Sequence, residues 1–177
     1  VGSSEVARIV YRRASATGKR VQALGGAKNH LIVLPDADMD AAVDACVASA
    51  FGSSGQRCLA GSVFTGVGDA YEPFRERVLD AVKELRLGDG LDPATHMGPV
   101  ISAAHRDRVR AFIDAGASGQ GTLVLDGRDA TVPGLEGGHW VGPTVFEDVA
   151  MDTPLGSEEV FGPVVALSRL DTVDQAV

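Results

Sequence analysis

The residues best suited to chemistry lie in the stretch Phe51-Gly52-Ser53-Ser54-Gly55-Gln56-Arg57-Cys58-Leu59-Ala60-Gly61-Ser62. Cys58 lies in a glycine- and serine-rich segment outside any apolar periodicity, so its thiol is predicted to be exposed. The positive charge of Arg57 beside it favours the thiolate, which is the nucleophilic form of cysteine. A lone cysteine is more often a small buried hydrophobe. Taken by itself, the pattern leaves both interpretations of Cys58 open.

A helix is predicted directly before this stretch, from about Asp38 to Phe51. Its apolar residues recur at the helical spacing i, i+3, i+4, i+7, and they are Met39, Ala42, Val43, Cys46, Val47, Ala50 and Phe51. Cys46 belongs to this stripe and is predicted to be buried. The two cysteines therefore receive different interpretations.

Composition bounds the class of protein. The chain has 177 residues, of which 45% are hydrophobic, and a mean hydropathy of +0.08, as in a soluble globular core. No run of 18 or more apolar residues occurs, so no membrane segment is expected. The net charge of -8 and the scattered basic residues provide no electrostatic surface for DNA or RNA, so nucleic acid is not expected as a partner.

The two cysteines, without a signal peptide or a spaced framework, indicate a reducing compartment rather than a disulfide scaffold. The expected location is the cytoplasm, or the mitochondrial matrix if the source is eukaryotic. The four histidines show no metal-ligand spacing with the cysteines, so no metal is expected.

Helical and extended segments alternate along the chain. Helices are predicted over residues 5–16, 36–51, 71–87 and from about Ser102, and extended runs over 19–24, 30–34, 61–67, 122–125, 140–146 and 160–170. The run from His30 to Leu34 is continuously apolar and is expected to be a buried strand. Gly88 is expected to end the helix predicted over residues 71–87. This alternation predicts an α/β domain with a largely parallel sheet.

Neither end of the chain has the features of a natural terminus. Val1 is not a methionine, and Gly2, Ser3 and Ser4 resemble a turn that enters a helix with Ser3 or Ser4 as the N-cap. Residues 171–177 resemble the opening turn of a further helix. The chain is therefore expected to be a fragment.

Three motifs together resemble the aldehyde dehydrogenase superfamily. They are the Phe-Gly-x-x-Gly-Gln-x-Cys-x-Ala-Gly-Ser stretch around Cys58, Ala23-Leu24-Gly25-Gly26 upstream of it, and Glu158-Glu159-Val160-Phe161-Gly162-Pro163-Val164 downstream. Their order and separation match the family, and the resemblance covers essentially the whole chain. It implies that residues 1–26 are the end of a Rossmann-like cofactor domain and that residues 27–177 are a truncated catalytic domain. The first nucleotide-binding strands and the oxyanion-hole Asn would lie upstream of Val1.

Within the superfamily, residues 18–30 are similar to methylmalonate-semialdehyde dehydrogenase, the CoA-acylating branch. Hydrolytic members carry a Glu at the position of Ala23, as the base that activates water. An alanine methyl group cannot accept a proton. The resemblance therefore implies that the acyl group passes to a thiol, with coenzyme A as co-substrate.

The same resemblance implies a covalent mechanism. Cys58 would attack the aldehyde, NAD would take the hydride, and coenzyme A would take the acyl group from the resulting thioester. Because the substrate of this branch bears a carboxylate, Arg57 would be its clamp through a bidentate ion pair. A solvated surface charge is the plain alternative for Arg57.

Four further residues are expected to bind the cofactor, again by resemblance. Ser3 would face the dinucleotide pyrophosphate from a helix N-terminus, and Gly25 would let the nicotinamide pass close to the backbone. Glu159 would accept hydrogen bonds from the nicotinamide ribose, with Phe161 packed beside the nicotinamide. Without the resemblance, Ser3 is an ordinary cap, Gly25 a turn residue and Glu159 a surface carboxylate.

Two other functions remain open at this point. One is a hydrolytic aldehyde dehydrogenase that lacks its usual base, and the other is a fragment with a purely structural or binding role. The full-length parent is expected to be a homotetramer or a homodimer that acts on a small semialdehyde.

Overall fold

The computed structural model describes residues 1–177 and contains one five-stranded sheet in the order β1-β2-β5-β4-β3. Its strands are β1 (His30–Val33), β2 (Val63–Val67), β5 (Val164–Leu170), β4 (Thr144–Glu147) and β3 (Thr122–Leu125). The first four strands are parallel neighbours, and only β3 runs antiparallel, beside β4. The predicted α/β fold with a largely parallel sheet is confirmed.

Three of the four long helices begin at a residue whose side chain caps the first turn. The helices are α1 (Ser4–Ser15), α2 (Met39–Phe51), α3 (Tyr71–Lys83), α4 (Ala103–Ala115) and the short α5 (Pro154–Ser157) and α6 (Val173–Ala176). The side chains of Ser3, Asp38 and Ser102 accept hydrogen bonds from the first turns of α1, α2 and α4. These caps satisfy backbone donors that a helix leaves free at its start.

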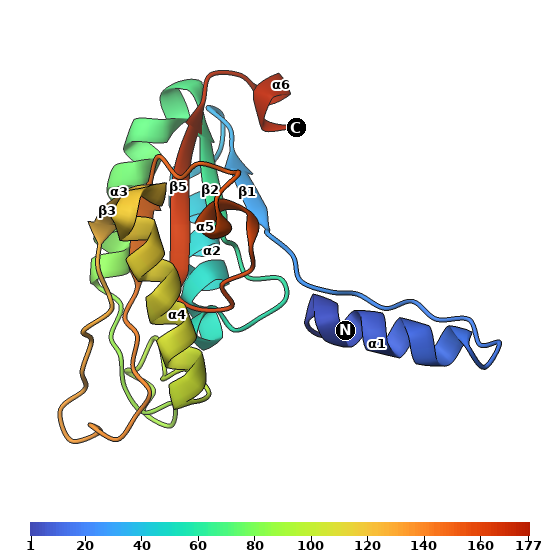
Figure 1. Cartoon of the computed structure of the whole chain (residues 1–177). Helices are drawn as coiled ribbons and strands as arrows, with labels where there is room; N and C mark the ends of the chain where they lie inside the picture. The colour runs from blue at the N-terminus through green and yellow to red at the C-terminus, as the bar shows by residue number, and fades with distance from the viewer.

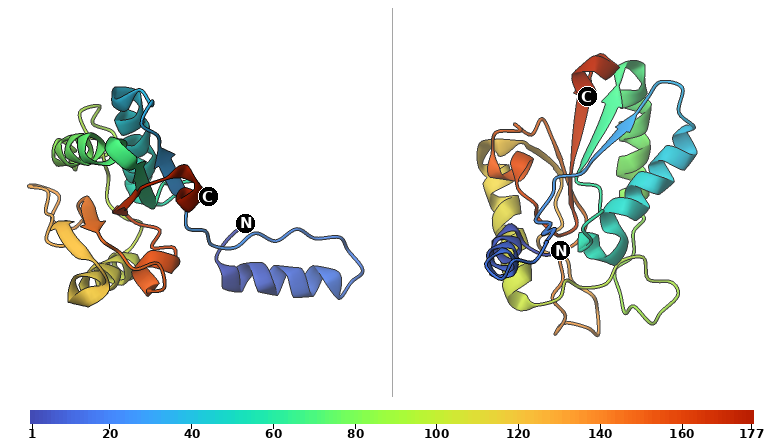
Figure 2. Two further views of the ribbon diagram at one scale, coloured as in Figure 1. Left: turned by 90° about the horizontal axis from the view of Figure 1, so that it is seen from above. Right: turned by 90° about the vertical axis from the view of Figure 1, so that its right-hand side faces the viewer.

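The sheet lies between two helical layers, with α2 and α3 on one face and α4 and α5 on the other (Figures 1 and 2). Successive side chains of a strand point to opposite faces, so each strand supplies both cores. In β2, Phe64 packs with α2 and α3, whereas its neighbour Val63 packs with α4. In β5, Leu167 likewise packs with α2 and α3, and Ala166 packs with α4.

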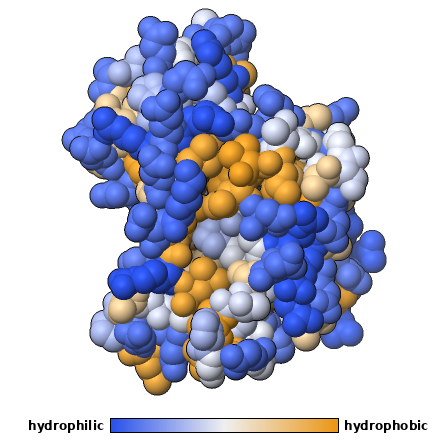
Figure 3. All heavy atoms as spheres, turned by 90° about the vertical axis from the view of Figure 1, so that its left-hand side faces the viewer, coloured by the Kyte–Doolittle hydropathy of each residue, from blue (hydrophilic) through white to orange (hydrophobic).

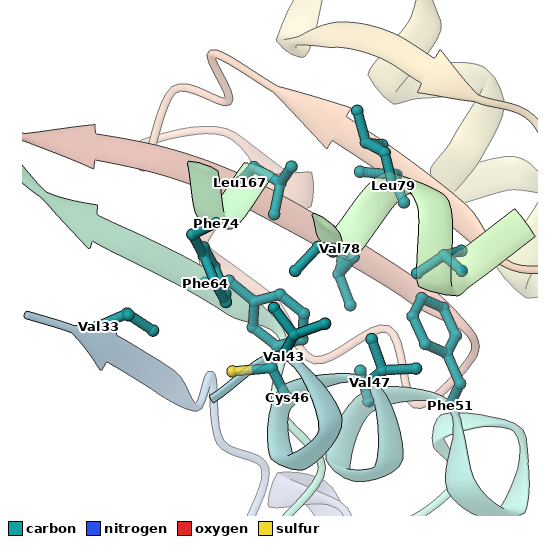
Figure 4. Packing of buried hydrophobic residues seen from close by; sticks show 14 of the residues in the cluster. Val33, Val43, Cys46, Val47, Phe51, Phe64, Phe74, Val78, Leu79 and Leu167 are labelled. Atoms are coloured by element: carbon teal, nitrogen blue, oxygen red, sulfur yellow. The ribbon is translucent and has the colours of Figure 1, made fainter. Parts of the chain in front are cut away.

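The prediction that Cys46 is buried is confirmed. The side chain is 3% exposed and belongs to the core between α2, α3 and the sheet. Figure 4 shows its sulfur pointing into this core on the side of Val33 and Phe64. Burial raises the pKa of the Cys46 thiol to about 11, so this cysteine is a packing residue.

Helix α1 and the chain up to residue 29 extend away from the body of the molecule (Figures 1 and 2). None of the residues of helix α1 is buried, and Val6, Ile9 and Val10 are 44–50% exposed. On the side of the molecule away from α1, hydrophobic residues gather in the middle of the face (Figure 3). The predicted division between residues 1–26 and 27–177 stays a prediction.

Three details differ from the sequence-based expectations. Strand β1 is not fully buried, because it is the edge strand and pairs only with β2; of its residues only Val33 is buried. Helix α3 ends at Lys83 and not at Gly88, since Leu87 and Met97 form a bridge that draws the chain away from the helix axis. Residues 19–24 join no sheet. None of the helices combines the length and the apolar sequence that a membrane span requires.

The parallel strands bring the chemically interesting residues to one edge. Asn29 directly precedes β1, the loop with Cys58 precedes β2, and Glu159 and Phe161 precede β5. Parallel strands start at the same edge of a sheet, so all three segments meet at the amino-terminal edge. Open α/β sheets usually bind ligands at the carboxyl edge, so this arrangement is the reverse of the common one.

Candidate active site

The loop from residue 52 to residue 62, called here the thiol loop, has an unusual backbone. Ser53 and Ser54 have positive φ values of 53° and 55°, which few residues other than glycine adopt. The buried Ser54 hydroxyl donates to the carbonyl of Gly98 at 2.6 Å. Gly55 also has a positive φ, and a Cβ there would lie 2.3 Å from the carbonyl oxygen of Gly162. The thiol loop is thus held closely against the segment that precedes β5.

Cys58 is exposed and free, as predicted. The carboxamide nitrogen of Asn29 donates at 2.9 Å to the carbonyl of Cys58 and at 2.9 Å to that of Ala60. These bonds fix the backbone from Cys58 to Ala60. The side chain of Cys58 lines a pocket together with Arg57 and the end of α2 at Ala48 and Ser49.

Arg57 has a structural contact that the sequence did not indicate. Its Nη2 donates to the carbonyls of Ala48 at 2.8 Å and Ser49 at 2.7 Å, near the carboxyl end of α2. A cation at this end of a helix also interacts favourably with the helix dipole. Arg57 also lines the same pocket as Cys58, which is compatible with its predicted role as a substrate clamp. That role stays a prediction.

A second pocket, of about 370 Å³, is lined by two of the four predicted cofactor residues, Ser3 and Glu159, but not by Gly25 or Phe161. Ser3, Ser4, Gly26, Lys28 and Glu159 are among its lining residues. The Gly26 N–H donates to the Ser4 hydroxyl at 3.2 Å. A Cβ at Gly25 would lie 2.7 Å from that hydroxyl, and one at Gly26 would lie 2.9 Å from a carboxylate oxygen of Glu159. The turn can approach both groups only because it consists of glycines.

Phe161 does not line the second pocket. It lies with Glu159 in a small cavity that also contacts Arg57 and Gly55 of the thiol loop. This cavity shares Arg57 with the pocket of Cys58 and Glu159 with the second pocket, so it lies between them. The φ of Phe161 is 57°, a strained conformation for a bulky side chain.

Three residues on this side of the site had no functional role predicted from the sequence. Lys28 donates from Nζ to the carbonyls of Leu155 at 2.7 Å and Glu158 at 3.0 Å. Arg108 on α4 donates to the carbonyls of Val160 at 2.8 Å and Glu159 at 3.1 Å. His105, one turn earlier on α4, lies with Nε2 2.6 Å from the carbonyl of Phe161. The i, i+3 spacing of His105 and Arg108 was the available signal, but it equally fits a solvated helix face.

Burial lowers the pKa of Lys28 to about 8, and this effect outweighs the attraction of the Glu158 and Glu159 carboxylates, which raise it. Lys28 is therefore partly desolvated beside two acidic side chains. No group of three or more His, Cys, Asp or Glu side chains is arranged to hold a metal ion.

The family model described as "Aldehyde dehydrogenase family" matches residues 1–177. The chain belongs to the aldehyde dehydrogenase family. The resemblance read from the Cys58, Gly25-Gly26 and Glu159 motifs is thereby confirmed.

Similar aldehyde dehydrogenases cover the whole chain. A malonate-semialdehyde dehydrogenase of Halalkalibacterium halodurans is 45% identical over 177 residues, which are 100% of this chain and 36% of that protein. A mitochondrial protein of Drosophila melanogaster, assigned as an acylating methylmalonate-semialdehyde/malonate-semialdehyde dehydrogenase, is 42% identical over 100% of this chain and 34% of its own length.

A solved structure shares the fold. A protein from Sinorhizobium meliloti, assigned as a methylmalonate-semialdehyde dehydrogenase and solved in complex with NAD, superposes with a TM-score of 0.94 and 40% identity. The match covers 99% of this chain and 36% of that one. The chain thus spans about a third of the length of the relatives it matches.

Proposed function

We propose that this chain is the thiol-bearing part of an NAD-dependent, CoA-acylating dehydrogenase of methylmalonate or malonate semialdehyde. One observation carries the proposal: the exposed Cys58 shares a pocket with Arg57, and its loop contacts the segment that contains Glu159 and Phe161. A nucleophile, a cation for a carboxylate and candidate cofactor contacts are thereby adjacent. The names of the similar dehydrogenases support this substrate class.

Cys58 is the proposed nucleophile. Its thiolate forms a bond to the aldehyde carbon, and its own backbone N–H is a candidate donor to the resulting oxyanion. After oxidation the acyl group is bound to Cys58 as a thioester. The thiol of coenzyme A loses its proton to solvent, its thiolate attacks the thioester carbon, and the Cys58 sulfur leaves as thiolate, which restores the starting state. The bonds of Asn29 to the Cys58 and Ala60 carbonyls would keep the sulfur in place throughout.

The second pocket is suited to the nicotinamide side of NAD. Ser3 lies at the amino end of the 12-residue helix α1, where a phosphate is favoured. Glu159 lines this pocket, and its carboxylate is an acceptor for hydroxyl groups. Gly25 and Gly26 leave open the space that side chains would fill. NAD, when bound, supplies the acceptor for the hydride that leaves the aldehyde carbon.

Arg57 is proposed to bind the substrate carboxylate. Its Nη2 is held by the two carbonyls of α2, which would fix the direction of the guanidinium before substrate arrives. A preorganised cation loses less side-chain freedom on binding. The contact with α2 is thus compatible with a second role at the pocket.

Transfer to coenzyme A rather than to water follows from Ala23, which offers no base to activate water. The word "acylating" in the name of the Drosophila relative supports the same outcome for this chain. We further propose that residues 1–26 belong to a cofactor domain completed by other residues, because α1 has no buried residue here. The isolated chain should then bind NAD weakly and be inactive. Both cysteines are free, which fits the cytoplasm as the proposed compartment.

Mass spectrometry of the acyl-enzyme tests the proposal. The full-length protein is incubated with malonate semialdehyde and NAD in the absence of any thiol, then quenched in acid and digested. An acyl mass increment on the peptide that contains Cys58, removed by added coenzyme A, is expected. An unmodified Cys58 peptide accompanied by NADH formation would contradict it.

A further inference from the structure

The segment from Glu158 to Phe161 carries both predicted contacts to the nicotinamide side, and it has no regular secondary structure. A segment of this kind would ordinarily be mobile, yet a cofactor contact must be held in one position. The contacts that hold this segment in place therefore bear on cofactor binding.

Its four successive carbonyls are held by three side chains from elsewhere in the fold. Lys28 bonds to the carbonyl of Glu158, Arg108 to those of Glu159 and Val160, and His105 to that of Phe161. A carbonyl oxygen only accepts, so His105 donates from a protonated Nε2. Lys28 also donates to the carbonyl of Leu155, which lies shortly before the segment. Bonds from charged donors are stronger than neutral ones.

Two of the three side chains are themselves held by aromatic rings. The Arg108 guanidinium lies 4.9 Å from the centre of the Phe112 ring, and the His105 ring packs edge-on against Phe161. Lys28 directly follows the Gly25-Gly26-Ala27 turn, so its bonds tie that turn to the segment that carries Glu159. Phe161 is held in its strained backbone conformation, which persists only where neighbouring groups enforce it.

We propose that Lys28, His105 and Arg108 form a carbonyl brace that positions Glu159 and Phe161 for the dinucleotide. They are positioning residues, because each acts through the backbone of the segment. This inference rests on the proposed function for its ligand, and the brace itself rests on the hydrogen bonds alone. It assigns Lys28, which the family motifs left without a role.

Two measurements on the full-length protein test the brace. The first is amide hydrogen exchange of peptides covering residues 158–162 in the absence of NAD. Arg108→Gln should speed this exchange and leave the exchange of β2 unchanged. The matched control is Arg106→Gln, on the same helix, since Arg106 pairs with Asp107 and not with the segment. Equal exchange in both variants would overturn the brace.

The second measurement separates positioning from general stability. Arg108→Gln should raise the KM for NAD by about tenfold with little change in the KM for aldehyde, and Arg108→Lys should recover part of the loss. His105→Gln, which keeps a donor, should be milder than His105→Leu. A fall in melting temperature without any change in the KM for NAD would overturn the positioning role.

Failure of the proposed function gives a different result. If the unaltered full-length protein neither binds nor reduces NAD, the proposed function is wrong, and the exchange measurement still decides whether the brace holds the segment. If NAD is bound equally well by the unaltered protein and by Arg108→Gln, the brace inference alone is wrong.

Discussion

The carboxamide of Asn29 donates to the carbonyl of Cys58 at 2.9 Å, across a gap of 29 positions in the sequence. The same nitrogen bonds to Ala60, and the backbone carbonyl of Asn29 accepts from the N–H groups of Ser62 and Val63. Asn29 thus joins the start of β1 to the thiol loop. The residue next to it, Lys28, holds the segment that carries Glu159. Two adjacent residues therefore connect the nucleophile with the proposed cofactor contacts.

Replacing Asn29 by alanine should disturb the thiol loop. The carbonyls of Cys58 and Ala60 would lose their partner, at a cost of about 1–3 kcal/mol in unfolding free energy. We expect a kcat reduced by about tenfold, with a smaller effect on the KM for NAD. His30→Ala, which changes the exposed neighbour, is the control. Unchanged kcat and stability in Asn29→Ala would show that these bonds do not hold the loop.

Much of the fold could be predicted because local patterns and tertiary packing agree. The apolar stripe of α2 predicted the burial of Cys46. Ser3 was one of the two predicted caps of α1, and the helix starts expected near Asp38 and Ser102 coincide with the caps of α2 and α4. The exposure of Cys58 was also predicted, because Cys58 lies in a glycine- and serine-rich segment outside the apolar periodicity of the preceding helix.

What failed depended on neighbours distant in sequence. Strand β1 has an apolar sequence, but its place at the sheet edge follows from strand order. Helix α3 stops early because Leu87 pairs with Met97. Lys28, His105 and Arg108 could not be found as a group, since only the fold brings α4 beside the segment at 158–161. Likewise, nothing local indicated that Arg57 would bond to α2.

The two cysteines should differ sharply in reactivity. Cys58 is exposed, whereas Cys46 is 3% exposed and has a pKa of about 11. Alkylation of the folded protein near neutral pH, followed by peptide mapping, should label Cys58 first, because the thiolate is the reactive form. Cys58→Ala should abolish oxidation, while Cys46→Ala should cost about 1 kcal/mol of stability and leave the chemistry intact. Faster labelling of Cys46 would contradict this assignment.

Substitution of Arg57 separates its two roles. Arg57→Leu should raise the KM for malonate semialdehyde by on the order of 10²-fold, since a charge-assisted bond of about 2–3 kcal/mol is lost. Propanal, which has no carboxylate, should be much less affected. The variant should also lose some stability through the free carbonyls of Ala48 and Ser49. Equal losses for both aldehydes would mean that Arg57 only supports the loop.

Lys28 should give the protein a defined pH dependence. Its pKa is lowered to about 8 in the folded state from 10.5, so between these values the unfolded chain binds more protons. The contribution of Lys28 to the unfolding free energy therefore rises from pH 8 to 10.5, by at most about 1.4 kcal/mol per pH unit, and is constant below pH 8.

Urea unfolding of the unaltered protein and of Lys28→Met, at pH 7.5 and at pH 10, measures this contribution. The stability difference in favour of the unaltered protein should be larger at pH 10. Taking the difference removes the opposite contribution of Cys46, whose raised pKa lowers stability as pH rises from 9 to 11 in both proteins. A difference that shrinks with pH would mean that Lys28 is not desolvated.

Cys58 is proposed to pass its acyl group to coenzyme A because Ala23 cannot activate water. Steady-state NADH formation by the full-length protein, followed with malonate semialdehyde and NAD with and without coenzyme A, tests it most directly. Continuous turnover is expected with coenzyme A. Without any thiol, a burst of about one NADH per active site should be followed by a rate lower by on the order of 10²-fold. Equal steady rates with and without coenzyme A would contradict it.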